Sequence, residues 1–505
     1  MMRLTVLLTL MLVVVSGVAG AQVLNVGVGA DAVRLDPPDQ TDNVSEIVLR
    51  HIMDGLVEFD QQLGIQPALA TSWDVLNDGK TYCFYLRENV VFHDGTPFNA
   101  EAVKYNFDRI LGGGLRRTSL YDPYIESVEV VDEYTVALHL FEPFGALLHH
   151  LAHGAGLIQS PAAIEQYGDR VGRNPVGTGP FVFERWVPGE RIVLTANPTY
   201  WGGEPKISGL SFNIVPEEAT RVFQLEAGES DVIFNVPPTD VARLERSNKV
   251  DVLIADSIRV IYGGMSTHKP PFDNVKVRQA FNYAIDQQLI VDYILEGFGT
   301  VTDSIIAPLT TGYYSTGGYP HDPERAKELL AEAGYPQGLT VNFWTPNGRY
   351  LKDYETSLVM QQMLAEAGIN AELQIMEWGA YISAIFDVNA ETAEAELYLL
   401  GWAPSTGDAD WVLRPLFSSE HFPPLGDNAS FYANPALDEA IRKAMTEPDP
   451  VKRNEYYQEG QQIIHDEAVM IPLHVLQQIV AKSSNVEGVK ILPIEIVLLK
   501  DAYVK

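Results

Sequence analysis

The sequence contains a single cysteine, Cys83, and comparatively few basic residues. Its 505 residues include 35 Lys and Arg against 67 Asp and Glu, so the formal net charge is −32. One cysteine has no partner for an intramolecular disulfide, and an acidic chain without a basic patch is not expected to bind nucleic acid or anionic lipid. Hydrophobic residues nevertheless make up 46% of the chain, a share typical of globular proteins. The length predicts two or more lobes.

Recognisable catalytic motifs are missing as well. The nearest approach to a serine-hydrolase elbow, residues 264–268, lacks the second glycine that lets a helix pack behind the nucleophile. There is no Gly-rich phosphate loop with a lysine and no His-Glu-x-x-His zinc motif. Cys83 lies in a run of β-forming residues without a nearby histidine, so we interpret it as a small buried hydrophobe in a strand. The sequence therefore predicts a protein that is not an enzyme and needs no cofactor.

Three histidines lie close together at His149, His150 and His153. The i, i+4 spacing of the first and last puts them on one face of a helix, where two metal ligands would fit. No cysteine or carboxylate lies close by in sequence to complete a coordination shell. We therefore favour packed histidines with ordinary hydrogen bonds and predict no metal site.

The N-terminus has the layout of a secretory signal. Arg3 precedes an apolar run at residues 4–15, and small side chains follow up to Ala21. Twelve apolar residues are too few to span a bilayer, which takes roughly 20, so we predict export, cleavage after Ala21 and a mature chain that starts at Gln22. No later stretch is long and apolar enough to span a membrane, and no cysteine at the cleavage site offers a lipid anchor.

The pattern along the chain changes near Gly264. Before it the sequence is rich in predicted strands, with helices expected at residues 44–53 and 100–110 and a hairpin at 125–140. After it, strands expected at residues 340–344, 371–376 and 396–400 alternate with helices, which is the βαβ signature of an α/β lobe. Three of these helices share an opening in which a capping side chain precedes a proline: Asp322-Pro323, Asn434-Pro435 and Asp449-Pro450.

The last segment of the chain, residues 491–499, returns to β-type composition, and we expect it to add to the sheet of the first lobe. A chain that leaves one lobe and comes back crosses between the lobes twice. Two crossings are what a protein that closes about a hinge requires.

The loop after the expected strand 396–400 carries side chains suited to a small-molecule pocket. Trp402 and Trp411 supply apolar walls, and directed hydrogen bonds come from the polar residues between them: Ser405, Thr406, Asp408 and Asp410. Loops at the carboxyl ends of strands in an α/β sheet are where ligands usually bind. Arg349 and Tyr350 follow the strand 340–344 in the same way, and Arg349 is suited to a ligand carboxylate. An ordinary surface loop is the alternative for both.

Several short segments, in order along the chain, resemble the signature of cluster C, or family 5, solute-binding proteins of ABC importers. The resemblance rests on residues 68–73 (ALATSW), 78–82 (DGKTY), 91–98 (VFHDGTPF), 175–181 (PVGTGPF), 271–274 (PFDN), 277–280 (VRQA) and 283–286 (YAID). It covers essentially the whole mature chain. The family includes dipeptide-, oligopeptide-, nickel- and glutathione-binding proteins.

The resemblance implies an α/β fold like that of type II periplasmic binding proteins, in which two α/β lobes close on a ligand about a hinge. Residues 22–264 would form lobe I, residues 265–478 lobe II and residues 479–505 a return segment, with a β-rich subdomain inserted at about residues 50–165. It also implies a monomer in the periplasm that delivers its ligand to an ABC permease in the cytoplasmic membrane.

The resemblance bears on the ligand too. Peptide-binding members hold the ligand's ammonium group with an Asp at the position of Ser405, so ordinary peptides lose their main counter-charge here. Residues 401–417 instead resemble the glutathione-binding members, with Asp408 or Asp410 as a shifted ammonium partner and Arg349 for a carboxylate. The loop with Ala30 and Asp31 lies where the family brings backbone groups to the ligand. A di- or oligopeptide and a nickel chelate are the alternatives within the family, and a secreted hydrolase is the alternative outside it.

Overall fold

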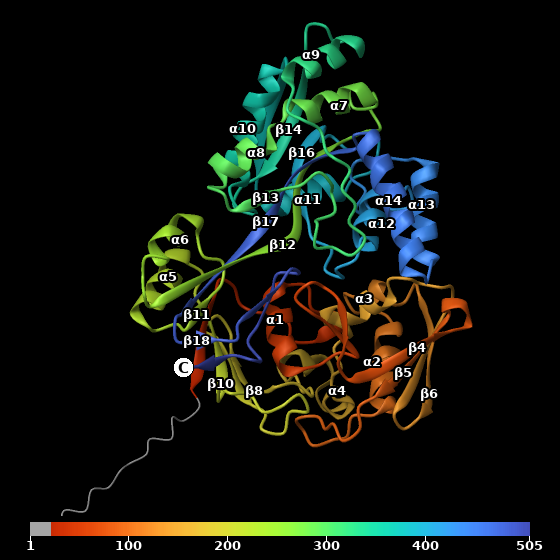
Figure 1. Cartoon of the computed structure of the whole chain (residues 1–505). Helices are drawn as coiled ribbons and strands as arrows, with labels where there is room; N and C mark the ends of the chain where they lie inside the picture. The colour runs from red at the N-terminus through yellow and green to blue at the C-terminus, as the bar shows by residue number, and fades with distance from the viewer. Residues whose placement is uncertain (1–21) are drawn as a thin grey trace, which may run out of the picture.

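Two long antiparallel strands, β12 (Val250–Met265) and β17 (Met470–Ser483), run from one half of the molecule into the other (Figure 1). The computed structural model describes residues 22–505, so the expected signal sequence at residues 1–21 lies outside the described residues. The two strands pair from Val250 opposite Ser483 to Gly264 opposite Met470, with an irregularity between Asp256 and Val260. They belong to one sheet of 11 strands that spans both halves, in the order β15-β14-β16-β12-β17-β11-β1-β10-β9-β8 with β13 beside β17.

The lower half in Figure 1, which we call lobe I, contains the first strand and the C-terminus. Its central strand β1 (Val23–Val28) is parallel to both β10 (Gly209–Ile214) and β11 (Val232–Ile233). The antiparallel strands β9 (Arg191–Ala196) and β8 (Phe181–Val187) complete this side of the sheet. The helices of this lobe are α1 (Asn43–Ile52), α5 (Glu218–Ala227) and α6 (Pro238–Leu244). The side chain of Asp42 caps α1 by accepting from the Ser45 N–H, as a helix start requires.

A separate four-stranded sheet is inserted between α1 and β8. Its order is β4 (Ala70–Leu76), β5 (Thr81–Leu86), β7 (Thr135–Leu140) and β6 (Ile125–Asp132), and the expected hairpin at residues 125–140 is confirmed by the β6–β7 pairing. Cys83 lies in β5 as predicted, but it is half-buried. The remaining elements of this subdomain are β2 (Val57–Phe59), β3 (Ile65–Pro67), α2 (Ala100–Leu111), α3 (Leu147–Ala152) and α4 (Pro161–Tyr167).

The upper half, lobe II, has the βαβ arrangement that its sequence predicts. Strand β14 (Leu339–Pro346) leads through α10 (Asp353–Glu366) to the parallel strand β15 (Ile369–Met376), and β16 (Leu397–Trp402) is parallel to β14 on its other side. The three capped helices are confirmed as α9 (Pro323–Glu332), α13 (Pro435–Thr446) and α14 (Pro450–Asp466). The other elements are α7 (Val275–Ala284), α8 (Gln287–Leu289), β13 (Gly299–Val301), α11 (Trp378–Phe386) and α12 (Asp410–Phe417).

The expectation that residues 491–499 join the sheet of the first lobe is wrong. Strands β19 (Lys490–Leu492) and β20 (Ile496–Leu498) instead pair with each other, because the chain turns back on itself between them. Beside them, β18 (Val486–Glu487) pairs with β21 (Tyr503–Val504). The strand that enters the lobe I sheet is β17, which pairs with β11. Among residues 22–505 no helix has the length and apolar character of a membrane span.

Candidate functional site

The carboxyl ends of β14 and β16 bring together three of the residues singled out in the sequence. Arg349 and Tyr350 follow β14, and their backbone N–H groups donate to a carboxylate oxygen of Asp353 at 2.8 and 3.0 Å. The Tyr350 hydroxyl then donates to the carbonyl of Gly401, next to Trp402, at 3.3 Å. Because β14 and β16 are neighbouring parallel strands, their following loops meet at one edge of the sheet.

Arg349 presents a positive charge at this edge. Its guanidinium lies over the rings of Tyr350 and Trp378, at 4.9 and 5.0 Å from the ring centres, while the residue remains exposed. Among residues 22–505 no carboxylate forms a salt bridge with it. A guanidinium has five N–H donors, so Arg349 keeps the capacity to hold a carboxylate in a bidentate pair. Sequence reasoning missed Trp378, because a lone tryptophan at the start of a helix carries no motif.

Trp402 connects this edge to the crossing strands. Its backbone lies opposite Val260 of β12, at the end of the irregular stretch described above. Its indole N–H donates to the carbonyl of Trp411 at 2.6 Å, which fixes the ring against the loop that follows β16. Ser405 is half-buried in that loop, whereas Thr406 is fully buried and its hydroxyl has no hydrogen-bond partner in the described part of the chain.

Asp408 lies fully buried beneath the loop. One carboxylate oxygen accepts from the Tyr457 hydroxyl at 2.6 Å, and the other accepts from Arg453 at 3.1 Å. Burial would lower the pKa of the Arg453 guanidinium, but the charge of Asp408 outweighs it and the pKa is raised. Asp408 therefore already has a cationic partner from α14.

Asp410 is neutralised in the same manner. Arg414, one turn further along α12, donates to its carboxylate at 2.8 Å. Burial alone would raise the pKa of Asp410, but the charge and hydrogen bonds of Arg414 and the contact with His150 hold it well below the usual range. Neither carboxylate is thus a free counter-charge for a ligand ammonium group.

Helix α3 of the inserted subdomain covers these two carboxylates. His149 contacts the Thr311 hydroxyl at 3.1 Å and Asp408 at 3.6 Å, and His150 lies 3.7 Å from Asp410. Within residues 22–505 no group of three or more His, Cys, Asp or Glu side chains is placed to hold a metal ion. These contacts dock the loop after β16 onto the subdomain, so this part of the predicted set lies in a packed interface.

The lobe I residues of the predicted set are separate from both groups. Ala30 is exposed just after β1. The Asp31 carboxylate accepts from the Trp186 indole at 2.9 Å and from the Gly189 N–H at 2.7 Å, and so it holds the turn between β8 and β9. Its two oxygens are engaged within lobe I.

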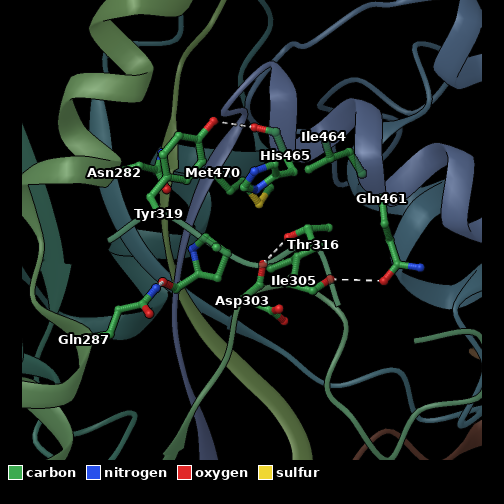
Figure 2. A pocket seen from close by; sticks show the side chains of 13 residues that line it. Asn282, Gln287, Asp303, Ile305, Thr316, Tyr319, Gln461, Ile464, His465 and Met470 are labelled. Carbon is green, nitrogen blue, oxygen red and sulfur yellow. Dashed lines mark hydrogen bonds between the residues drawn. The ribbon is translucent and has the colours of Figure 1, made fainter. Parts of the chain in front are cut away.

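A small cavity, whose lining residues all belong to lobe II, lies beside the strand β17 (Figure 2). It is lined by residues that include Asp303, Gln461 and His465, and the Tyr319 hydroxyl donates to the His465 carbonyl at its edge at 2.7 Å. Its volume of about 20 Å³ holds about one water molecule. Pockets for drug-sized ligands measure roughly 300–1,000 Å³, so we place no peptide-sized ligand in it.

Four buried histidines predict that stability falls in mild acid. Burial lowers the pKa of His51 and His149 to about 4 and that of His153 and His474 to about 3, against an ordinary value of 6.5. These rings stay neutral in the folded protein while the unfolded chain takes up protons below pH 6.5, so stability is present above that pH and falls below it.

We expect the thermal midpoint, followed by circular dichroism, to be flat from pH 8 to 7 and to fall steadily from pH 6.5 to 5. This window lies above the range in which ordinary carboxyl groups titrate. Replacement of His474, whose two ring nitrogens have no partner in the described chain, by Phe should make the fall shallower. A midpoint that does not move over this range would contradict the prediction.

Comparison with known proteins agrees with this architecture. A family model described as bacterial extracellular solute-binding proteins, family 5 Middle, matches residues 64–423. The glutathione-binding protein GsiB of Escherichia coli O1:K1 is 36% identical over 471 residues, which make up 93% of this chain and 92% of that protein. HbpA2 from Haemophilus parasuis superposes with a TM-score of 0.87 at 28% identity, covering 96% of this chain and all (100%) of that one. DppA from Helicobacter pylori, solved with the peptide STSA, gives 0.79 at 30% identity, covering 95% and 98%.

Two α/β lobes joined by two crossing strands, together with these relatives, identify a solute-binding protein with the type II periplasmic-binding-protein fold, and not an enzyme. The family resemblance noted in the sequence is confirmed. The chain belongs to family 5 of the bacterial extracellular solute-binding proteins.

Proposed function

We propose that this protein binds glutathione between its lobes and delivers it to an ABC permease in the cytoplasmic membrane. The observation that carries the proposal is the 36% identity to GsiB over 92% of that protein's length. Ser405, in place of the aspartate that peptide-binding members use for the ligand's ammonium group, supports a ligand whose ammonium group is placed differently. Glutathione has that property, because its first peptide bond runs through the γ-carboxyl group.

In this proposal the edge at β14 and β16 provides the first contacts. Arg349 holds a ligand carboxylate, and Tyr350 and Trp402 pack against the ligand's apolar parts, with Ser405 and Thr406 beside them. Asp408 and Asp410, whose charges are already balanced, shape the loop from below. The backbone after β1, at Ala30, approaches from lobe I.

Closure follows from contacts made by both lobes. The irregular stretch of β12 between Asp256 and Val260 is where we propose that the two crossing strands bend. A ligand shifts the balance between open and closed forms only through its difference in affinity for the two forms. Contacts from one lobe alone would leave that balance unchanged.

The proposal places the mature protein, residues 22–505, in the periplasm after removal of the signal sequence. A monomer free of nucleic acid is sufficient for this function. The net charge of −32 does not help to capture an anionic ligand, and we interpret it as a contribution to solubility.

Isothermal calorimetry tests the ligand. The exported protein is first unfolded and refolded to remove any bound solute, and it is then titrated with reduced glutathione, Ala-Ala and Ni²⁺ with histidine. We expect one molecule of glutathione per chain with micromolar affinity, which corresponds to roughly −8 kcal/mol, and weaker binding of the other two. Binding of Ala-Ala or of the nickel chelate without binding of glutathione would overturn the choice of ligand, and turnover of any of them would overturn the class.

A further inference from the structure

The turn between β19 and β20 carries an acidic side chain to the crossing strands. Glu495 lies in this turn with φ 64, a conformation that costs energy for a residue other than glycine. The turn is fixed on β12, because the Ile258 N–H donates to the Pro493 carbonyl at 2.9 Å. Strained residues of this kind cluster at functional sites.

Glu495 forms a two-pronged ion pair with Arg259 of β12. The Nε and Nη2 atoms of the guanidinium donate to the two carboxylate oxygens at 2.7 and 2.8 Å. Asn43, the first residue of α1, donates to the same carboxylate at 3.1 Å. Three segments that are far apart in the sequence therefore meet where the chain passes between the lobes.

The pair retains hydrogen-bonding capacity. A carboxylate offers about four lone-pair positions, and Arg259 and Asn43 fill three of them in Glu495. A guanidinium has five N–H donors, and Arg259 uses two on Glu495. The side chains of Arg259 and Glu495 are 15% and 20% exposed, so both are partly open to solvent.

Arg349 lies on the strand edge beside this pair. The hydroxyl of Tyr350, whose ring lies beneath Arg349, donates to the Gly401 carbonyl at 3.3 Å. The next residue, Trp402, lies opposite Val260, the neighbour of Arg259. Burial would raise the pKa of Glu495, but the charge and hydrogen bonds of Arg259, the bond from Asn43 and the charge of Arg349 together lower it. The edge at β14 and the ion pair on β12 are thus parts of one charged region.

We propose that Arg259 and Glu495 act with Arg349 to select ligands that carry two carboxylates and one ammonium group. The region offers two positive charges and one negative charge, which is the complement of such a ligand. The two guanidinium groups hold the carboxylates. Glu495 is paired, as Asp408 and Asp410 are, but it is 20% exposed where they are buried and it keeps one lone-pair position, so it takes the ammonium group that Ser405 cannot hold. This inference rests on the proposed function and adds the chemical rule for its ligands.

An ordinary dipeptide has one carboxylate and one ammonium group. Its single carboxylate can satisfy either Arg349 or the three N–H donors that Arg259 does not use on Glu495, and the other set of donors loses water without gaining a partner when the lobes close. Desolvated donors of a charged group that gain no partner are costly. The same arrangement would therefore reject ligands that lack the second carboxylate.

The test measures the coupling between Glu495 and the ligand's ammonium group. Calorimetry compares glutathione with N-acetylglutathione, which lacks that charge, on the wild-type protein and on Glu495→Gln. We expect the substitution to weaken glutathione binding roughly tenfold or more and to leave the affinity for the acetylated ligand unchanged. Equal losses for both ligands would show a purely structural role and overturn the proposal.

Two controls accompany this comparison. Glu487→Gln changes a half-buried carboxylate of the same segment, which pairs with Lys505, and it should alter neither affinity. Arg259→Lys keeps the charge but loses the two-pronged geometry, and it should weaken glutathione binding with the fold intact by circular dichroism.

The failure of the proposed function can be told apart from the failure of the rule that the ligand must carry two carboxylates. If the wild-type protein binds dipeptides and not glutathione, the proposed function is overturned. Ala-Glu and Ala-Gln then test the rule, since only the first has two carboxylates. A clear preference for Ala-Glu would support the rule, and equal affinities would overturn it.

Discussion

Replacing Arg349 with alanine is expected to weaken glutathione binding about 100-fold. The guanidinium stacks on Tyr350 and Trp378 without a carboxylate partner in the described chain, so its donors are available for the ligand. Charged hydrogen bonds contribute about 1.5–3 kcal/mol each, and a bidentate pair would reach two orders of magnitude in affinity. Calorimetry with glutathione measures the effect.

Arg325→Ala is the matched control for this prediction. Arg325 is a surface arginine of α9 that pairs with Glu328, away from the crossing strands. Its removal should leave glutathione affinity unchanged. Arg349→Lys should recover part of the loss, because a lysine keeps the charge but not the planar fork. Wild-type affinity in Arg349→Ala would show that the ligand carboxylate binds elsewhere.

Replacing Asp408 with alanine is expected to destabilise the fold by about 3–5 kcal/mol. The change leaves Arg453, which is buried, without its carboxylate, and it removes the acceptor of the Tyr457 hydroxyl. Urea unfolding followed by tryptophan fluorescence measures the loss. Because the Asp408 charge is already balanced, we expect the folded variant to keep its glutathione affinity.

Two further variants sharpen this test. Asp408→Asn keeps the shape of the side chain and should be folded if the alanine variant is not. Asp501→Ala removes one partner of an exposed pair with Lys490 and should cost less than about 1 kcal/mol. Unchanged stability of Asp408→Ala would contradict this structural role. A large loss of glutathione affinity at unchanged stability would show that Asp408 contacts the ligand, as the sequence suggested.

Local signals in the sequence predicted much of the fold. Asp322, Asn434 and Asp449 each cap a helix that begins at the following proline, because capping depends on neighbours within three residues. The expected ends of two neighbouring strands likewise predicted that Arg349 and Trp402 lie on one edge of the sheet, as the parallel pairing of β14 and β16 shows. The tail was mispredicted, since composition reveals a strand but not the partner with which it pairs.

Ion pairs between residues far apart in the chain explain which features of the site could not be predicted from the sequence. Arg259 and Glu495 are 236 residues apart, and no local pattern connects them. Arg453 lies 45 residues after Asp408, so an aspartate that looks available in the sequence is neutralised in the fold. A loop rich in carboxylates therefore indicates a ligand site only when the cationic side chains that pack around it are known.

The order of strands across the sheet also constrains how the protein is made. Strand β17 lies between β12 and β11, so the sheet of lobe I needs residues 470–483 before its central strands are fully paired. Lobe II, whose strands β14, β15 and β16 all precede β17, has most of its own sheet earlier in the chain. Although its first strand emerges first during synthesis, lobe I is the last to be completed. The half of the molecule that holds both β1 and the C-terminus can mature only when translation is nearly finished.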